Sequence, residues 1–258
     1  MTKNNPPLNH HYVPEFYQKG FSNDEGKIFA YKKAFGSIKG RFASEILYEK
    51  NLHTIEYRGD RNFMIEQYYS QIETEFSKYI IQFKYVVNDT NLLSQLQNDE
   101  SFVKILKIII AIQFWRTPCQ TDRVKKYCEN LVGIYDAASI ENKKLLGNDR
   151  KFVKFLQKRS DKVSIRKTIQ FMLLPLITFD LSGEGEGFKY FLAGKDDQKF
   201  VTCDRPVLFD DETELFSYKK FCFPLSKELL VVCSGQVFSD TKIGCSSAIF
   251  RSKTLGDR

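Results

Sequence analysis

The sequence predicts an α+β protein, in which a central helical bundle packs with a mostly antiparallel sheet formed by N-terminal and C-terminal strands. Helical periodicity dominates residues 60–178, whereas segments rich in aromatic and β-branched residues precede and follow this block. Hydrophobic residues make up 42% of the chain and charged residues 28%, as in ordinary globular proteins. The polar, proline-containing residues 1–9 predict a flexible N-terminal arm, and residues 10–258 a single domain.

The N-terminal part of this domain is expected to contain one short helix and two strands. Pro14 favours the start of a helix, and Gly20 is placed to end it. Alternating residue types predict a strand over 27–35, and residues 49–55 predict a second, shorter one.

The central block begins with the strongest helical pattern, over residues 60–85, for which Asp60 is the expected N-cap. Apolar residues recur on one face of this helix: Ile65, Tyr68, Tyr69, Ile72, Phe76, Tyr79, Ile80 and Phe83. A helix over 99–116 is apolar nearly all round, so it is expected at the centre of the fold. Three more helices are predicted, over 120–141, 149–158 and 162–178, the last kinked or closed by Pro175.

The pattern changes to strands after the glycine-rich turn at 182–187. The strand-like segments are 188–194, 199–203, 219–225 and 228–234. They are too few to bury a core alone, so the turn is not expected to separate independent domains.

Charge and hydropathy narrow the classes of function. The net charge of +7 fits an anionic partner such as nucleic acid, and fits a need for solubility equally well. The longest apolar run, over 108–115, is shorter than the roughly 20 residues that span a bilayer, and no membrane association is expected. The polar start of the chain is not a secretion signal, which predicts a cytoplasmic protein with reduced cysteines.

Cofactor motifs are absent from the sequence. The six cysteines form no CxxC pair and the three histidines lack zinc-site spacing, so no zinc is expected. GxxxxGK[ST] and GxGxxG do not occur, so no nucleotide cofactor is expected, and neither GxSxG nor HExxH is present.

Polar residues at unexpected positions mark candidate sites, and two such groups lie in the first third of the chain. His10 and His11 stand together before Tyr12, where they could transfer protons or bind metal, or form a plain surface pair. Glu66 and Glu73 project at nearly the same angle from the margin of their helix's apolar face. They could bind a divalent cation or share acid–base work, or simply pair with nearby cations.

Two further groups follow. Gln113 and Arg116 lie on neighbouring angles at the end of the apolar helix, where the guanidinium could hold a carboxylate or phosphate. Arg116 could equally reach solvent at the helix end, where a cation suits the helix dipole. Asp204 follows a predicted strand and precedes a proline, and it either caps the turn or projects into a cleft.

Five motifs occur in an order that is similar to a known family. They are HHYVPEFYQKGFS, IEQYYSQIETEFS, QFWRTP, VTCDRP and FPLSKELLVV. Together they resemble the bacterial family known by its HYVP start, domain-of-unknown-function family 4238, from about residue 10 to about residue 235. The resemblance implies five recurrent polar residues: His11, Glu66, Glu73, Arg116 and Asp204. This chain has Cys203-Asp204-Arg205-Pro206 where the family usually shows Ser-Asp-Asn-Pro, so contacts made through that Ser and Asn are not carried over.

The first functional hypothesis is a nuclease-like hydrolase, the effector of a bacterial conflict or phage-defence system. His11 would be the general acid or base, and Arg116 would stabilise charge on the phosphate. Glu66, Glu73 and Asp204 would either fix the tautomer of His11 or bind one Mg²⁺ or Mn²⁺, which leaves metal dependence open. Substrate contacts are expected from His10, Tyr12, Gln113 and Lys227.

The alternative hypothesis is a binding module without chemistry. The same polar residues would then form a buried network, or a pocket for an anionic ligand, nucleic acid or a protein partner.

Overall fold

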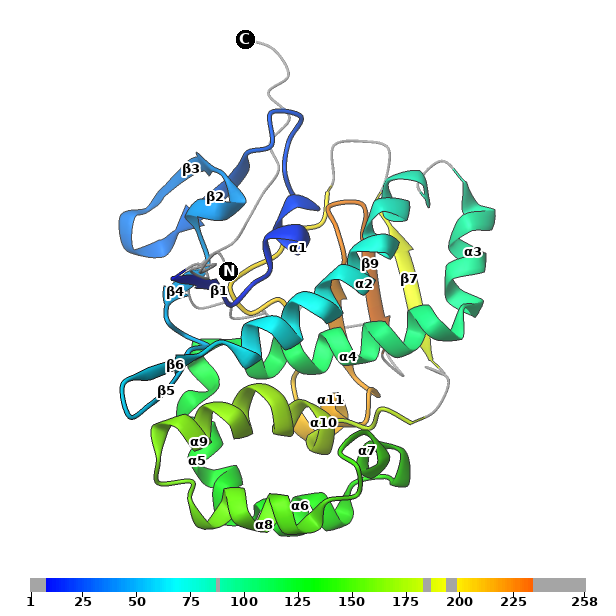
Figure 1. The fold of residues 1–258 in the computed structure, drawn as a ribbon. Coiled ribbons are helices and arrows are strands. Elements are labelled where there is room, and N and C mark those ends of the chain that lie inside the picture. The colour runs from blue at the N-terminus through cyan, green and yellow to red at the C-terminus, as the bar shows by residue number, and fades with distance from the viewer. Residues whose placement is uncertain (1–7, 87–88, 183–186, 194–198, 234–258) are drawn as a thin grey trace, which may run out of the picture.

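Helices and short antiparallel strands form an α+β fold, as predicted from the sequence. The structure is a computed structural model that describes residues 8–86, 89–182, 187–193 and 199–233. In Figure 1, α2 (Met64–Val86) and α4 (Glu100–Arg116) cross the middle of the molecule. Short N-terminal hairpins lie on one side of them, a C-terminal sheet on the other, and a group of short helices below.

The two central helices differ in how they begin. The Asp99 carboxylate caps α4 by accepting from the backbone N–H groups of Ser101 and Phe102, at 2.8 and 3.1 Å. The prediction of Asp60 as the cap of α2 is wrong, because Asp60 belongs to the preceding hairpin of β5 (Ile55–Tyr57) and β6 (Asp60–Asn62). The left-handed conformations of Arg58 and Gly59 close that hairpin, so the helix begins only at Met64.

The predicted helix over 120–141 is divided into three. These helices are α5 (Thr121–Glu129), α6 (Leu131–Ala137) and α7 (Ile140–Leu145). Asn130 leaves the helical conformation, and the Ser139 hydroxyl caps α7 by accepting from the Asn142 N–H at 3.1 Å. The second interruption thus arises at Ser139, whose side chain competes with the helix for backbone hydrogen bonds.

The remaining helices follow the predictions more closely. α8 (Arg150–Lys158) and the short α1 (Glu15–Lys19), which ends at Gly20, lie where expected. The region 162–178 contains α9 (Val163–Thr168), a π-helical turn (Ile169–Leu173) and α10 (Leu174–Thr178), with Pro175 in the first turn of α10. Two short helices were not predicted: α3 (Thr90–Asn98) and α11 (Glu212–Phe216).

The strands are antiparallel, as predicted, but they form four separate sheets among the described residues. The pairs are β1 (Asn9–His11) with β4 (Tyr48–Lys50), β2 (Ile28–Lys32) with β3 (Ser37–Arg41), and β5 with β6. The fourth sheet has the order β7 (Phe188–Leu192), β9 (Leu229–Cys233), β8 (Phe221–Pro224). β1 begins at Asn9, within the predicted arm, and residues 1–7 of that arm lie outside the described residues.

N-terminal and C-terminal strands therefore do not share one sheet, because α1 lies between them. The Tyr17 hydroxyl donates to the Pro224 carbonyl at 2.7 Å and lies 2.8 Å from the Thr202 hydroxyl. These contacts attach α1 to the end of β8 and to Thr202. The segment 199–203, which contains Thr202, forms no strand despite its alternating pattern.

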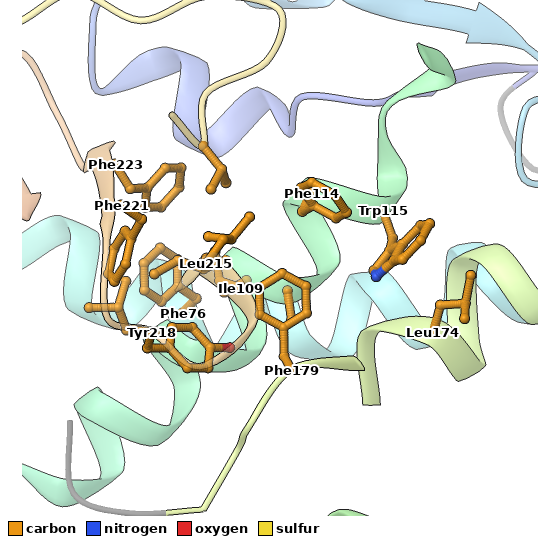
Figure 2. Packing of buried hydrophobic residues seen from close by; sticks show 14 of the residues in the cluster. Phe76, Ile109, Phe114, Trp115, Leu174, Phe179, Leu215, Tyr218, Phe221 and Phe223 are labelled. Carbon is orange, nitrogen blue, oxygen red and sulfur yellow. The ribbon is translucent and has the colours of Figure 1, made fainter. Parts of the chain in front are cut away.

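A large aromatic core joins the helices to the C-terminal sheet (Figure 2). The labelled members are Phe76, Ile109, Phe114, Trp115, Leu174, Phe179, Leu215, Tyr218, Phe221 and Phe223. Trp115 is fully buried, and its indole N–H donates to the Thr178 hydroxyl at 2.9 Å. Burial of each large apolar side chain contributes about 1.5–3 kcal/mol, so α4, which supplies many of them, is held firmly at the centre.

Two global features accompany this core. No helix among the described residues has the length and apolar character needed to cross a bilayer. Five cysteines are described, and all are free thiols: Cys119, Cys128, Cys203, Cys222 and Cys233.

Candidate functional site

The N-terminal histidines lie on opposite faces of β1. His10 pairs with Glu49 in the two-stranded β1–β4 sheet and its ring is buried, while His11, the next residue, faces the other way. The chain then turns after β4 and brings His53 back onto His10. The His53 backbone N–H donates to His10 Nδ1 at 2.9 Å, and the two rings stack with centroids 5.4 Å apart.

Glu66, in the first turn of α2, joins this histidine pair to the helical core. Its carboxylate accepts a hydrogen bond from His53 Nδ1 and lies 3.4 Å from His10 Nδ1. Both rings are buried, whereas the Glu66 side chain is 24% exposed. The three residues therefore form a cluster that is closed on the protein side and reaches solvent through the carboxylate.

The protonation states of this cluster follow from burial and charge. Desolvation by burial lowers the pKa of His53 to about 3, against the opposing effect of its bond to Glu66. Burial acts to raise the pKa of Glu66, but the hydrogen bond from His53 and the nearby charges, including that of Arg116, hold it below the ordinary value. At neutral pH a neutral imidazole thus donates to an ionised carboxylate.

Arg116 forms the second half of the site. Its guanidinium Nη1 donates to Glu73, two turns beyond Glu66 on α2, and its centre lies 4.4 Å from the ring centroid of Tyr69. The Arg116 side chain is only 4% exposed, and its Nε has no hydrogen-bond partner among the described residues. Arg116 therefore does not reach solvent at the helix end, and Glu73 is the partner that its buried charge requires.

Gln113 and Tyr12 connect Arg116 with the N-terminal segment. The Gln113 side chain donates to the Tyr12 carbonyl at 2.9 Å. A small cavity beside Gln113 and Arg116 offers about 10 Å³ to the centre of a water molecule, which is room for about one water. Burial, and next the negative charge of Asp204, raise the pKa of the Tyr12 hydroxyl to about 12, so Asp204 acts on this side of the site.

His11 lies at the edge of the site. Its Nδ1–H donates to the Ile46 carbonyl at 3.1 Å, and its Nε2 lies 3.1 Å from Glu15 Oε1. Burial lowers the pKa of His11; Glu15 opposes this effect, and the charges of Arg116 and Glu66 also reach the ring. Its direct partners are thus Ile46 and Glu15, while Glu66 acts on it through charge.

Most of the residues proposed from the sequence meet around β1, α2 and α4. Lys227 makes its contacts elsewhere, because its ammonium donates to the Ser22 carbonyl at 2.8 Å and lies 3.9 Å from Glu228. His53 is the important residue that sequence reasoning did not select. The available signal was its rarity, since it is one of three histidines, combined with its place in a segment read as a strand.

Three side chains of the site are arranged so that they could hold a metal ion. One potential ligand atom each from His10, His53 and Glu66 lies within 4.8 Å of the other two. In the described part of the chain, this is the one group of three or more metal-ligating side chains that converge in this way. Glu66, Glu73 and Asp204, the carboxylates considered from the sequence, do not form such a group with one another.

The fold and the site together define an α+β protein whose N-terminal histidine segment is joined to a helical core by a buried histidine, glutamate and arginine cluster. The family model described as "Protein of unknown function (DUF4238)" matches residues 9–242. The chain belongs to this family. No curated protein and no solved structure matches the chain.

Proposed function

We propose that the protein cleaves phosphodiester bonds, as a nuclease effector acting in the bacterial cytoplasm. One observation carries this proposal: Glu66, which contacts His10 and His53, and Glu73, which is paired with Arg116, lie two turns apart on one margin of α2, so the histidine segment and the guanidinium border one site. An imidazole, a carboxylate and a guanidinium in one site can together move a proton and stabilise negative charge on a phosphate.

His11 is the proposed general acid or base. Its side chain is 13% exposed, whereas His10 and His53 are fully buried. The bond from Nδ1–H to Ile46 leaves Nε2 for proton transfer. Glu15, which faces Nε2, is 39% exposed and would be replaced there by the substrate.

Arg116 is the proposed phosphate contact. Its Nε is a buried donor that lacks an acceptor among the described residues, and a phosphate oxygen would supply one. Gln113 and Tyr12, joined by a hydrogen bond beside it, would position the substrate. The net charge of +7 would attract a polyanion to the protein.

A binding module without chemistry is the second candidate, and one separate observation favours it. An open cavity of about 920 Å³ lies away from the histidines, between α5, α6, α7, α10 and α11. Its volume is typical of ligand sites, and Arg123 and Lys126 line it beside the rings of Tyr127 and Phe216. Asp180 and Glu212 line it as well, with Glu212 paired to Arg123, so a polar ligand with an aromatic group would suit this lining.

Cleavage assays with purified protein distinguish these functions. The wild type and His11→Ala would be incubated with end-labelled single- and double-stranded RNA and DNA, with and without Mg²⁺ or Mn²⁺. Lys19→Ala, an exposed change on the same short helix as Glu15, is the matched control. Cleavage by the wild type and the control, but not by His11→Ala, is expected. If the wild type leaves every substrate intact under all these conditions, the nuclease proposal is wrong.

A further inference from the structure

We propose that His10, His53 and Glu66 bind one divalent ion of a first-row transition metal. The three residues come from β1, from the turn after β4 and from the first turn of α2. This inference does not depend on the proposed reaction, because it concerns binding of the ion alone.

The separation of the potential ligand atoms fits a shared ion. Two ligands that each lie 2.0–2.1 Å from a tetrahedral metal are about 3.3 Å apart. His10 Nδ1 and Glu66 Oε1 are 3.4 Å apart. The contact between His53 Nδ1 and Glu66 is closer than this, so the carboxylate would move outward to admit the ion, and its partial exposure leaves it space to do so.

The donor set selects the class of ion. Two imidazoles and one carboxylate suit Mn²⁺, Fe²⁺, Co²⁺ and Zn²⁺, whereas Mg²⁺ and Ca²⁺ prefer sites made of oxygen alone. No zinc-site spacing is visible in the sequence because the ligands lie at positions 10, 53 and 66, far apart in the chain. The ion would keep open positions on the solvent side, next to the Glu66 carboxylate.

The unsatisfied nitrogen of His53 is a second, independent observation. His53 Nε2 is buried and has no hydrogen-bond partner among the described residues. It lies in an aromatic environment, with the rings of Tyr69 and Phe171 standing edge-to-face at 5.1 and 4.8 Å. With Nδ1 on the metal, Nε2 would carry the proton, and an N–H is better placed beside aromatic rings than a bare lone pair.

Two effects oppose the ion. His10 Nδ1 would exchange the hydrogen bond from the His53 amide for a metal bond, and a single amide hydrogen bond contributes less than a metal–imidazole bond. Arg116 is a nearby cation, and its ion pair with Glu73 reduces its repulsion of the ion. The ion therefore meets the net negative charge of Glu66.

Metal titration of the full chain tests the proposal. Chelator-treated wild-type protein would be titrated with Mn²⁺ and Zn²⁺ by calorimetry, with the Tm measured with and without each ion. We expect one equivalent to bind and the Tm to rise. Glu66→Gln should weaken binding at least tenfold, whereas Glu49→Gln, a change of an exposed carboxylate opposite His10, should leave the affinity unchanged.

A spectroscopic measurement covers the case in which Glu66→Gln fails to fold. X-ray absorption by the Zn²⁺-loaded wild type should show two imidazole ligands and no sulfur. The proposal is overturned if neither ion binds stoichiometrically, if folded Glu66→Gln binds as tightly as the wild type, or if the imidazole ligands are missing. Since no substrate is present, these outcomes leave the nuclease proposal to its own test.

Discussion

Removal of either partner of the Arg116–Glu73 ion pair should destabilise the protein strongly. The Arg116 side chain is 4% exposed and the Glu73 side chain 24%, so each charge has lost much of its hydration. The attraction of the other charge compensates for this loss. Breaking a buried pair by deleting one partner costs about 3–5 kcal/mol. Because the Glu73 carboxylate can still reach water, the loss of stability in Arg116→Met should lie at the lower end of this range, about 3 kcal/mol. Glu73→Gln, which leaves a buried cation without its anion, should cost about as much or more.

The double variant Arg116→Met/Glu73→Gln should lose less than the sum of the two single variants, because it leaves no unpaired buried charge. We expect a coupling of about 2 kcal/mol. Urea unfolding of the four proteins measures this cycle. In thermal scans, each single variant should lower the Tm by about 6–12 °C for a chain of this size.

The exposed ion pair of Asp136 and Arg150 is the matched control. Its two hydrogen bonds, both 2.7 Å long, have good geometry, but both side chains are about half exposed. Asp136→Asn should therefore give no resolvable change in the urea midpoint. If the losses at Arg116 and Glu73 add to within about 0.5 kcal/mol, the two groups are not coupled and the reasoning from burial is refuted.

Three further predictions concern the fold. Asp99→Ala should cost about 1 kcal/mol in urea unfolding through loss of the cap of α4, and an unchanged midpoint would show that the cap is dispensable. Phe223→Ala, at a fully buried ring stacked on Tyr17, should cost about 3–5 kcal/mol, and a loss below about 1 kcal/mol would contradict the described packing. Burial raises the pKa of the Cys222 thiol from 9.0 to about 11, so its contribution to stability is present below pH 9 and is lost as the pH rises towards 11. The stability difference between the wild type and Cys222→Ala should change in that window, and a constant difference from pH 8 to pH 11 would rule out a raised pKa.

The elements that were predicted well are those whose pattern repeats over several turns. The boundaries of α4 were predicted almost to the residue, because an apolar run lies between the cap Asp99 and the proline after Thr117. The prediction for α2 was wrong only at its start, where two residues in left-handed conformations close a hairpin that periodicity does not reveal. The segment 199–203 alternates like a strand, yet it forms none: its Phe200 N–H donates to the Lys227 carbonyl and its Thr202 hydroxyl contacts Tyr17.

The sequence predicted most residues of the site, but not which of them contact one another. The spacing of Glu66 and Glu73 correctly indicated one margin of α2, because seven residues return to nearly the same angle of a helix. Their partners could not be derived, since contact of Glu66 with His53 depends on the turn after β4, and contact of Glu73 with Arg116 depends on how α2 crosses α4. Short strands and turns carry too little periodicity to fix such contacts across the fold.

The cluster that would perform chemistry also joins β1 to α2, so a loss of activity alone does not identify a catalytic or metal-binding role. Glu66→Gln resolves this ambiguity better than alanine, because the amide keeps nearly the same volume and an oxygen that can accept from His53. If Glu66 serves mainly to attach the N-terminal segment, the urea midpoint should fall while metal affinity per folded molecule stays constant. If it serves mainly as a ligand, the affinity should fall far more than the stability of the metal-free protein. The loss of stability and the loss of metal affinity, both measured on Glu66→Gln, therefore distinguish a structural role of Glu66 from a metal-binding role.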